Sequence, residues 1–261
     1  MAFLAICLGI QAQNIEEAWY KVPRPDLEKF TRQDTLRGSI TPERSWWDLI
    51  HYHLDIDVNI DKRLLTGTNT ITYEVLEGEQ LMQIDLQPPL SISEVTQGGK
   101  SLDVEQDGNA WFVQLVKQQV PGSIESVKVS YWGTPREAIR APWDGGFSWS
   151  EDSNGNPFVA TSNQGLGASV WWPCKDHMYD EPDSMMMSFT VPRGLIAVGN
   201  GRLVNEEKNR RTHTFHWKVK NPINNYGVNL NIGDYVSFSE IFNGENGQLD
   251  CIYYVLRENE E

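Results

Sequence analysis

The sequence contains five histidines, the side chains that most often bind a catalytic metal ion. A zinc-peptidase helix carries the pattern His-Glu-x-x-His, because two imidazoles must reach the metal from one helix face. No histidine of this chain stands in that pattern. His51 and His53 share one strand face and could chelate an ion, but a solvated polar face explains them more simply. We therefore expect this chain to contain neither a metal site nor a catalytic residue.

A polar stretch from Thr161 to Gly165 separates two apolar runs and contains Ser162 and Gln164. Taken alone, such a stretch is typical of a turn. Two tryptophans follow it, and then come Pro173–Asp176 with the pattern Pro-Cys-x-Asp and, after a short gap, Glu181-Pro182. The order is unusual: a polar loop, paired tryptophans, a cysteine-containing motif and then a new apolar run.

This order resembles the signature of the N-terminal domain of the aminopeptidase N family of zinc peptidases, which includes the leukotriene hydrolases. The resemblance extends from about Ile50 to Glu261. Further short motifs follow in the family's order, and that shared order carries the resemblance: Tyr52–Ile56 followed by Gly67, Val129–Gly133, Val198–Gly201, Pro222–Tyr226 and Gly233–Tyr235.

The resemblance implies a role for Gln164. In the family, a loop of this domain reaches the active site, and a Gln or Glu on the loop accepts hydrogen bonds from the substrate's α-ammonium group. Counting back from Pro173, Gln164 occupies the matching position. A carboxamide oxygen can accept from a cation without burying a second full charge. Ser162, two positions earlier, matches a second polar contact of some relatives.

By the same resemblance, the parent protein would be a zinc-dependent aminopeptidase that removes single residues from peptides with a free N-terminus. Its zinc would be bound outside this chain, in a following catalytic domain on which this domain packs. The 261 residues alone should then be inactive. The chain departs from the family where His177–Asp180 separate the Pro-Cys-x-Asp motif from Glu181-Pro182, since relatives have no such gap. The loop around Gln164 can therefore differ in shape.

Alternating apolar and polar residues predict a β fold. From Ile50 to Val58 the alternation is strict, which is the signal of a half-buried strand. Gln97–Lys100 predicts a hairpin turn. About a dozen short strands of this kind predict an all-β protein, a large saddle-like sandwich of mostly antiparallel strands. Similar alternation marks residues 70–75, 127–131, 212–219, 226–232, 235–242 and 249–256.

The chain divides into four parts. Residues 1–13 are apolar and too short to span a bilayer, so we expect the remnant of a signal peptide and hence an exported protein, whether periplasmic, cell-surface or secreted. An ordinary buried segment is the alternative. Residues 14–48 form a polar N-terminal extension, and 49–256 form the β domain. Residues 257–261 are expected to be the junction to the catalytic domain.

Charge and cysteine content restrict the partners. The formal net charge of −14 argues against nucleic acid, because phosphate binding needs clustered Lys and Arg. We expect no stable membrane span. Outside the expected signal segment, only Cys174 and Cys251 remain, and no cysteine spacing matches a zinc site. We expect both to be free, buried thiols.

Ten tryptophans support an alternative function. Exposed tryptophans can stack on sugars, so a noncatalytic carbohydrate-binding or adhesion sandwich would also suit an exported all-β chain. We expect Trp171, Trp172 and Trp217 to fill the core instead, and the sequence leaves Trp143 and Trp149 undecided. A purely structural scaffold domain is a third possibility. The carbohydrate-binding alternative does not account for the ordered set of family motifs, and the scaffold alternative predicts no ligand contact.

Overall fold

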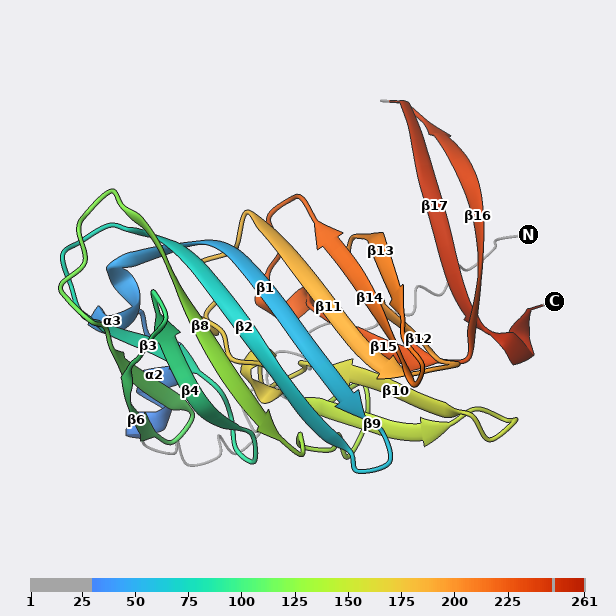
Figure 1. Ribbon diagram of the computed structural model, residues 1–261, viewed down its shortest axis with the longest axis horizontal. Coiled ribbons are helices and arrows are strands. Elements are labelled where there is room, and N and C mark those ends of the chain that lie inside the picture. The colour runs from blue at the N-terminus through green and yellow to red at the C-terminus, as the bar shows by residue number, and fades with distance from the viewer. Residues whose placement is uncertain (1–29, 246, 261) are drawn as a thin grey trace, which may run out of the picture.

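The computed structural model describes residues 30–245 and 247–260, which form a β-rich molecule (Figure 1). The expected signal remnant, residues 1–13, and the first part of the 14–48 extension lie outside the described residues. The rest of the extension contains two short helices that the alternation pattern did not predict. They are α2 (Arg32–Gly38) and α3 (Pro42–Ser45). A capping box between Thr31 and Asp34 begins α2, and Pro42 stands at the start of α3.

The largest sheet of the described residues has eight strands in the order β13-β14-β11-β1-β2-β8-β4-β5. Its neighbouring strands pair antiparallel, except that β1 and β11 are parallel. The strands are β1 (Trp47–Asn59), β2 (Leu64–Val75), β4 (Ser91–Gln97), β5 (Lys100–Ser101), β8 (Ile124–Gly133), β11 (Ser184–Pro192), β13 (Arg202–Lys208) and β14 (Thr212–Val219).

Strand β1 shows why the alternation predicts the fold. Tyr52, Leu54 and Ile56 are fully buried, whereas His53 and Asp55 between them face solvent. Successive side chains of a strand point to opposite faces, so one face enters the core. The strand begins at Trp47 rather than at Ile50, because Trp46 and Trp47 both pack against the ring of Tyr73 with centroids 5.7 Å apart.

Two smaller sheets complete the layers in the described part of the chain. One has the order β12-β15-β10-β9 and the other β3-β7-β6. The four-stranded sheet lies across one face of the large sheet (Figure 1). This arrangement confirms the expected all-β sandwich. The strands are β12 (Ile196–Gly199), β15 (Leu230–Gly233), β10 (Pro157–Ser162), β9 (Gly146–Glu151), β3 (Leu81–Asp85), β7 (Ala110–Gln114) and β6 (Asp103–Asp107).

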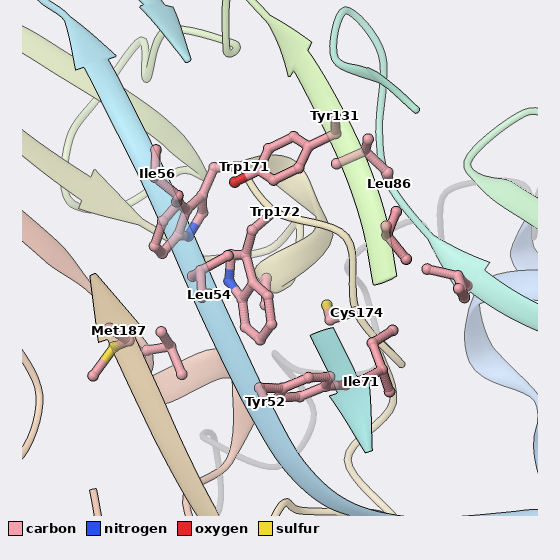
Figure 2. Close-up of a cluster of buried hydrophobic side chains, with 14 of the residues drawn as sticks. Tyr52, Leu54, Ile56, Ile71, Leu86, Tyr131, Trp171, Trp172, Cys174 and Met187 are labelled. Carbon is pink, nitrogen blue, oxygen red and sulfur yellow. The ribbon is translucent and has the colours of Figure 1, made fainter. Parts of the chain in front are cut away.

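The core between the layers contains the paired tryptophans (Figure 2). Trp171 and Trp172 are fully buried, and the ring of Trp172 meets Tyr52 edge-on with centroids 5.0 Å apart. Trp217 is also buried, so the prediction for all three tryptophans is confirmed. Of the two undecided tryptophans, Trp149 stacks on Phe147 and is partly buried. Trp143 is 75% exposed.

Two local expectations were wrong. The strand expected over 226–232 begins only at Leu230, because Asn224 caps a 3-10 turn, η2 (Asn225–Gly227), by accepting from the backbone N–H of Tyr226. That turn leaves Tyr226 half exposed. The two cysteines are free thiols, but only Cys174 is buried, whereas Cys251 lies partly exposed on the last strand.

The last two strands form a separate hairpin, β16 (Tyr235–Gly244) and β17 (Gly247–Leu256), followed by η3 (Arg257–Asn259). The hairpin projects away from the other sheets (Figure 1). The strands expected over 235–242 and 249–256 are present, and each extends two residues further toward the turn than expected. Large apolar side chains along the hairpin are 40% to 59% exposed: Phe238, Ile241, Phe242, Leu249, Ile252 and Tyr253.

Candidate functional site

Gln164 lies at the tip of a tight loop that directly follows β10. The backbone N–H groups of Leu166 and Gly167 both donate to the carbonyl of Asn163, which closes the loop. Gly165 and Gly167 have φ values of 73° and 83°, a region that favours glycine. The loop therefore turns sharply and leaves the side chain of Gln164 exposed.

The buried side chain of Asn163 fixes the base of this loop through hydrogen bonds. Its buried amide nitrogen donates to the carbonyls of Tyr226 and Val228, at 2.9 and 3.0 Å. Its amide oxygen accepts from the indole N–H of Trp171 at 3.0 Å. A buried amide with all these bonds satisfied holds one conformation, because releasing it would leave buried polar groups unpaired. The base of the loop is thus attached to the core and to the η2 turn.

Ser162, the second candidate, is the last residue of β10 and is half buried. Its hydroxyl donates to the carbonyl of Pro142 at 2.7 Å and accepts from the backbone N–H of Gln164 at 3.4 Å. The structure brings Ser162 and Gln164 together. The serine hydroxyl connects the loop to the neighbouring segment that carries Trp143.

Asp176, the last residue of the Pro-Cys-x-Asp motif, holds the far side of the loop. Its carboxylate accepts from the backbone N–H groups of Ala168 and Ser169 and from the Ser169 hydroxyl, at 3.2, 3.0 and 2.6 Å. These residues form the short turn η1 (Ala168–Val170). The Pro-Cys-x-Asp motif therefore shapes the loop that presents Gln164, which explains in physical terms why the two features occur together.

Buried charges behind the motif connect it to the N-terminal extension. The carboxylate of Asp85 accepts from the guanidinium of Arg44 at 2.5 Å and from the backbone N–H of Asp176 at 3.0 Å. Burial raises the pKa of Asp85, and the charge of Arg44 opposes that shift. Cys174 pairs with Asp85 through two backbone hydrogen bonds. Burial raises the pKa of the Cys174 thiol well above its ordinary value, so the thiol is a packing group rather than a nucleophile.

Lys175, the variable residue of the motif, is completely buried. Its ammonium donates to the carboxylate of Asp180 at 2.5 Å and to the carbonyl of Trp47 at 2.6 Å. It also lies 4.0 Å from the centre of the Trp47 ring, within the range of a cation–π contact. The sequence gives no sign of this role, because an isolated lysine beside acidic residues carries no signal of burial.

We expect the Lys175 ammonium to make stability depend on pH. Burial lowers the pKa of Lys175 to about 8, from an unfolded value of 10.5. Between these values the unfolded chain binds more protons than the folded chain, so the contribution of Lys175 to the unfolding free energy rises with pH. Urea unfolding from about pH 7 to about pH 10 should show the wild type gaining stability relative to Lys175→Met. A constant difference between the two proteins would contradict this expectation.

An open groove of about 900 Å³ adjoins the Gln164 loop. Gly165 and Gly167 of the loop line it, together with Tyr226. The other lining residues of the groove include Arg37 of α2, and His177 and Met178 from the segment after the Pro-Cys-x-Asp motif. Met178 is 82% exposed and lies in the four-residue departure from the family pattern. That departure therefore forms part of the groove.

The described residues contain no group of three or more His, Cys, Asp or Glu side chains placed to hold a metal ion. His51 and His53 each have a ring nitrogen near a serine hydroxyl of β11, at 2.8 and 3.4 Å. In the same part of the chain, no helix is both long and apolar enough to cross a bilayer.

Comparison with known proteins identifies the fold. No protein-family model matches the sequence, and no curated protein is significantly similar to it. Solved structures are similar. A mutant two-domain M1 zinc metallopeptidase bound to L-tryptophan aligns with a TM-score of 0.70 and 20% identity, covering 85% of this chain and 51% of that chain. A mutant M1 zinc metallopeptidase from Deinococcus radiodurans, bound to a Tyr-Ser-Ala substrate, aligns with a TM-score of 0.69 and 20% identity, covering 86% and 54%.

The chain therefore has the fold found in M1 zinc metallopeptidase structures over most of its length, and it spans about half the length of the solved chains. This finding confirms the fold that the sequence resemblance implied.

Proposed function

We propose that this chain belongs to the aminopeptidase N family and forms the N-terminal, substrate-anchoring domain of a zinc-dependent aminopeptidase that removes single residues from peptide N-termini. Two independent features support the proposal. The family motifs occur in order along the sequence, and the fold is shared with zinc metallopeptidases, two of which bind an amino acid and a peptide.

The observation that carries the proposal is the construction of the Gln164 loop. Its tip presents an exposed carboxamide, while its two sides are fixed by the buried amide of Asn163 and by the carboxylate of Asp176. A rigid loop can hold a ligand in place with little loss of conformational freedom on binding. A loop that served only as a connection would not need this support.

In the proposed role, the oxygen of Gln164 accepts a hydrogen bond from the substrate's α-ammonium group. Fixing that end of the peptide places its first amide bond at a constant position relative to the catalytic groups. Those groups would lie outside this chain, because the sequence has no His-Glu-x-x-His. A catalytic zinc ion bound there would supply Lewis-acid activation of the carbonyl and of water.

The β16–β17 hairpin supports packing on a catalytic domain. A two-stranded hairpin is marginally stable in water by itself, and this one exposes six large apolar side chains. Covering them with a second domain would bury apolar surface at about 25 cal/mol per Å².

Export remains part of the proposal. It is supported by the apolar composition of residues 1–13, which suits the hydrophobic region of a signal peptide.

The test of the proposed function is Gln164→Ala in the complete enzyme. Hydrogen bonds to charged groups contribute about 1.5–3 kcal/mol, so kcat/KM for peptides with a free N-terminus should fall about ten-fold or more. Steady-state kinetics on such peptides measure the effect. Gln114→Ala, at an exposed glutamine on β7, serves as the matched control and should leave the kinetics unchanged. Wild-type kinetics for Gln164→Ala would remove the residue from the site.

A further inference from the structure

The hydroxyl of Tyr226 lies directly beside the carboxamide of Gln164. We propose that Tyr226 supplies a second hydrogen-bond acceptor, so that the substrate's ammonium group binds across the oxygens of both side chains. This inference rests on the proposed role of Gln164 and extends the same site by one residue. No sequence pattern indicated a ligand contact for Tyr226, which ends the Pro222–Tyr226 motif and which the alternation placed inside a strand.

The contact between the two side chains determines which lone pairs remain free. The hydroxyl of Tyr226 donates to the amide oxygen of Gln164. The amide oxygen has two lone pairs and uses one of them in this bond. The phenolic oxygen donates its hydrogen and can still accept, and a hydroxyl that donates becomes a better acceptor because hydrogen bonds in a chain polarise one another. Two adjacent oxygens therefore remain able to accept from one cation.

An ammonium group needs more than one acceptor. It carries three N–H donors. Once a second domain excludes water from the site, each donor left unpaired costs free energy. Gln164 alone offers one free lone pair after its bond to Tyr226. The phenolic oxygen adds a neutral second acceptor, which avoids burying another full charge beside the ligand.

The backbone of Tyr226 is held as firmly as the Gln164 loop. Asn163 donates to the carbonyl of Tyr226, and Asn224 accepts from its N–H at 3.0 Å. The buried side chain of Asn225 donates to the carbonyl of Lys175 at 2.7 Å, which attaches the η2 turn to the Pro-Cys-x-Asp motif. Because Asn163 precedes Gln164 and bonds to Tyr226, one buried amide sets the positions of both acceptors.

Tyr226 is also accessible to a ligand. The residue is 51% exposed, and it lines the groove of about 900 Å³ together with Gly165 and Gly167. Gln164 precedes Gly165 on the same loop, and its amide oxygen is hydrogen-bonded to the Tyr226 hydroxyl, so the two oxygens lie together beside this groove. The half-exposed ring does not serve as core packing, so its hydroxyl can be removed without opening a cavity.

The test compares inhibition by L-leucinamide with inhibition by its des-amino analogue isocaproamide, using the complete enzyme. We define the ratio as the inhibition constant of isocaproamide divided by that of L-leucinamide. It measures recognition of the ammonium group, because the two ligands otherwise share their structure. Tyr226→Phe should reduce this ratio about five-fold, the effect of one ordinary hydrogen bond. Gln164→Ala should also reduce it, and the double variant should reduce it further than either single variant.

Three results would overturn the inference, and they are distinguishable. If Gln164→Ala reduces the ratio and Tyr226→Phe does not, Gln164 binds the ammonium without Tyr226, and the proposed function stands. If Tyr226→Phe has no effect in the Gln164→Ala background, Tyr226 acts only by orienting Gln164. If neither variant changes the ratio, the proposed function fails with the inference.

The matched control is Tyr73→Phe. Tyr73 also donates its hydroxyl to a glutamine amide oxygen, that of Gln119 at 3.2 Å, but it does so in the core at the end of β2. This variant should lower the urea midpoint and leave the inhibition ratio unchanged. A parallel urea titration of Tyr226→Phe should show the wild-type midpoint, which would confirm that its effect on the ratio does not arise from unfolding.

Discussion

Replacing Asp180 by asparagine is expected to lower the unfolding free energy by about 3–5 kcal/mol, because the buried ammonium of Lys175 then loses its counter-charge. Both charged groups are nearly inaccessible to water, with side-chain exposures of 0% and 6%. Asparagine keeps an oxygen that can accept from the backbone N–H of Leu49, a bond that Asp180 makes at 3.2 Å. The variant therefore removes the charge with little other change. Urea unfolding at neutral pH measures the loss.

Two further variants test the cause of that loss. Adding Lys175→Met to Asp180→Asn removes the isolated charge, so the double variant should be more stable than Asp180→Asn alone. Glu137→Gln breaks an exposed ion pair, in which the side chains of Arg63 and Glu137 are 49% and 52% exposed. This variant should lower the unfolding free energy by less than about 1 kcal/mol. Equal losses for Asp180→Asn and Glu137→Gln would show that the buried pair has no special role.

Gly167→Ala is expected to destabilise the protein by about 3 kcal/mol and to displace the Gln164 loop. Two effects add. At a φ of 83° a side chain is strained, which costs about 1–2 kcal/mol. A Cβ atom would also lie 2.4 Å from the carboxylate of Asp176, which would have to move and release its bonds to Ala168 and Ser169. Urea unfolding measures the stability loss, and kcat/KM of the proposed complete aminopeptidase reports the displacement.

Gly165→Ala separates the two effects. Gly165 has a φ of 73°, but a Cβ atom there would meet no atom within 4 Å. The backbone strain remains and the collision is absent, so the loss should be about 1 kcal/mol. If both alanine variants lose the same stability, Asp176 does not constrain the loop.

Much of the fold could be predicted from local patterns. Alternation identified β1 and its buried face, because that face is decided by which side chains avoid water. Gln97–Lys100 forms the expected turn between β4 and β5, with Gly98 and Gly99 both at positive φ. Periodicity failed at Tyr226, because it cannot distinguish a strand from a 3-10 turn capped by a neighbouring asparagine.

The pairing of β1 with β11 could not be predicted. His51 aligns with Ser184, a residue 133 positions away, and no local pattern specifies which distant strand will lie alongside. The buried ion pairs in and behind the Pro-Cys-x-Asp motif could not be predicted for the same reason, because no local pattern specifies their partners. Arg44 and Lys175 look like ordinary surface residues in the sequence, yet both are completely buried against carboxylates.

The sequence by itself determined most of the large sheet's long strands, the buried face of β1, the all-β class and the position of Gln164 relative to the Pro-Cys-x-Asp motif. These properties depend on residue type and on spacing along the chain. Only the tertiary structure placed Tyr226 beside Gln164 and made Asn163 and Asp176 the supports of the loop. The physical reason is that hydrogen-bond partners are selected by distance in space after folding. Gln164 and Tyr226 are 62 residues apart, and the antiparallel pairing of β10 with β15 in one sheet brings them together.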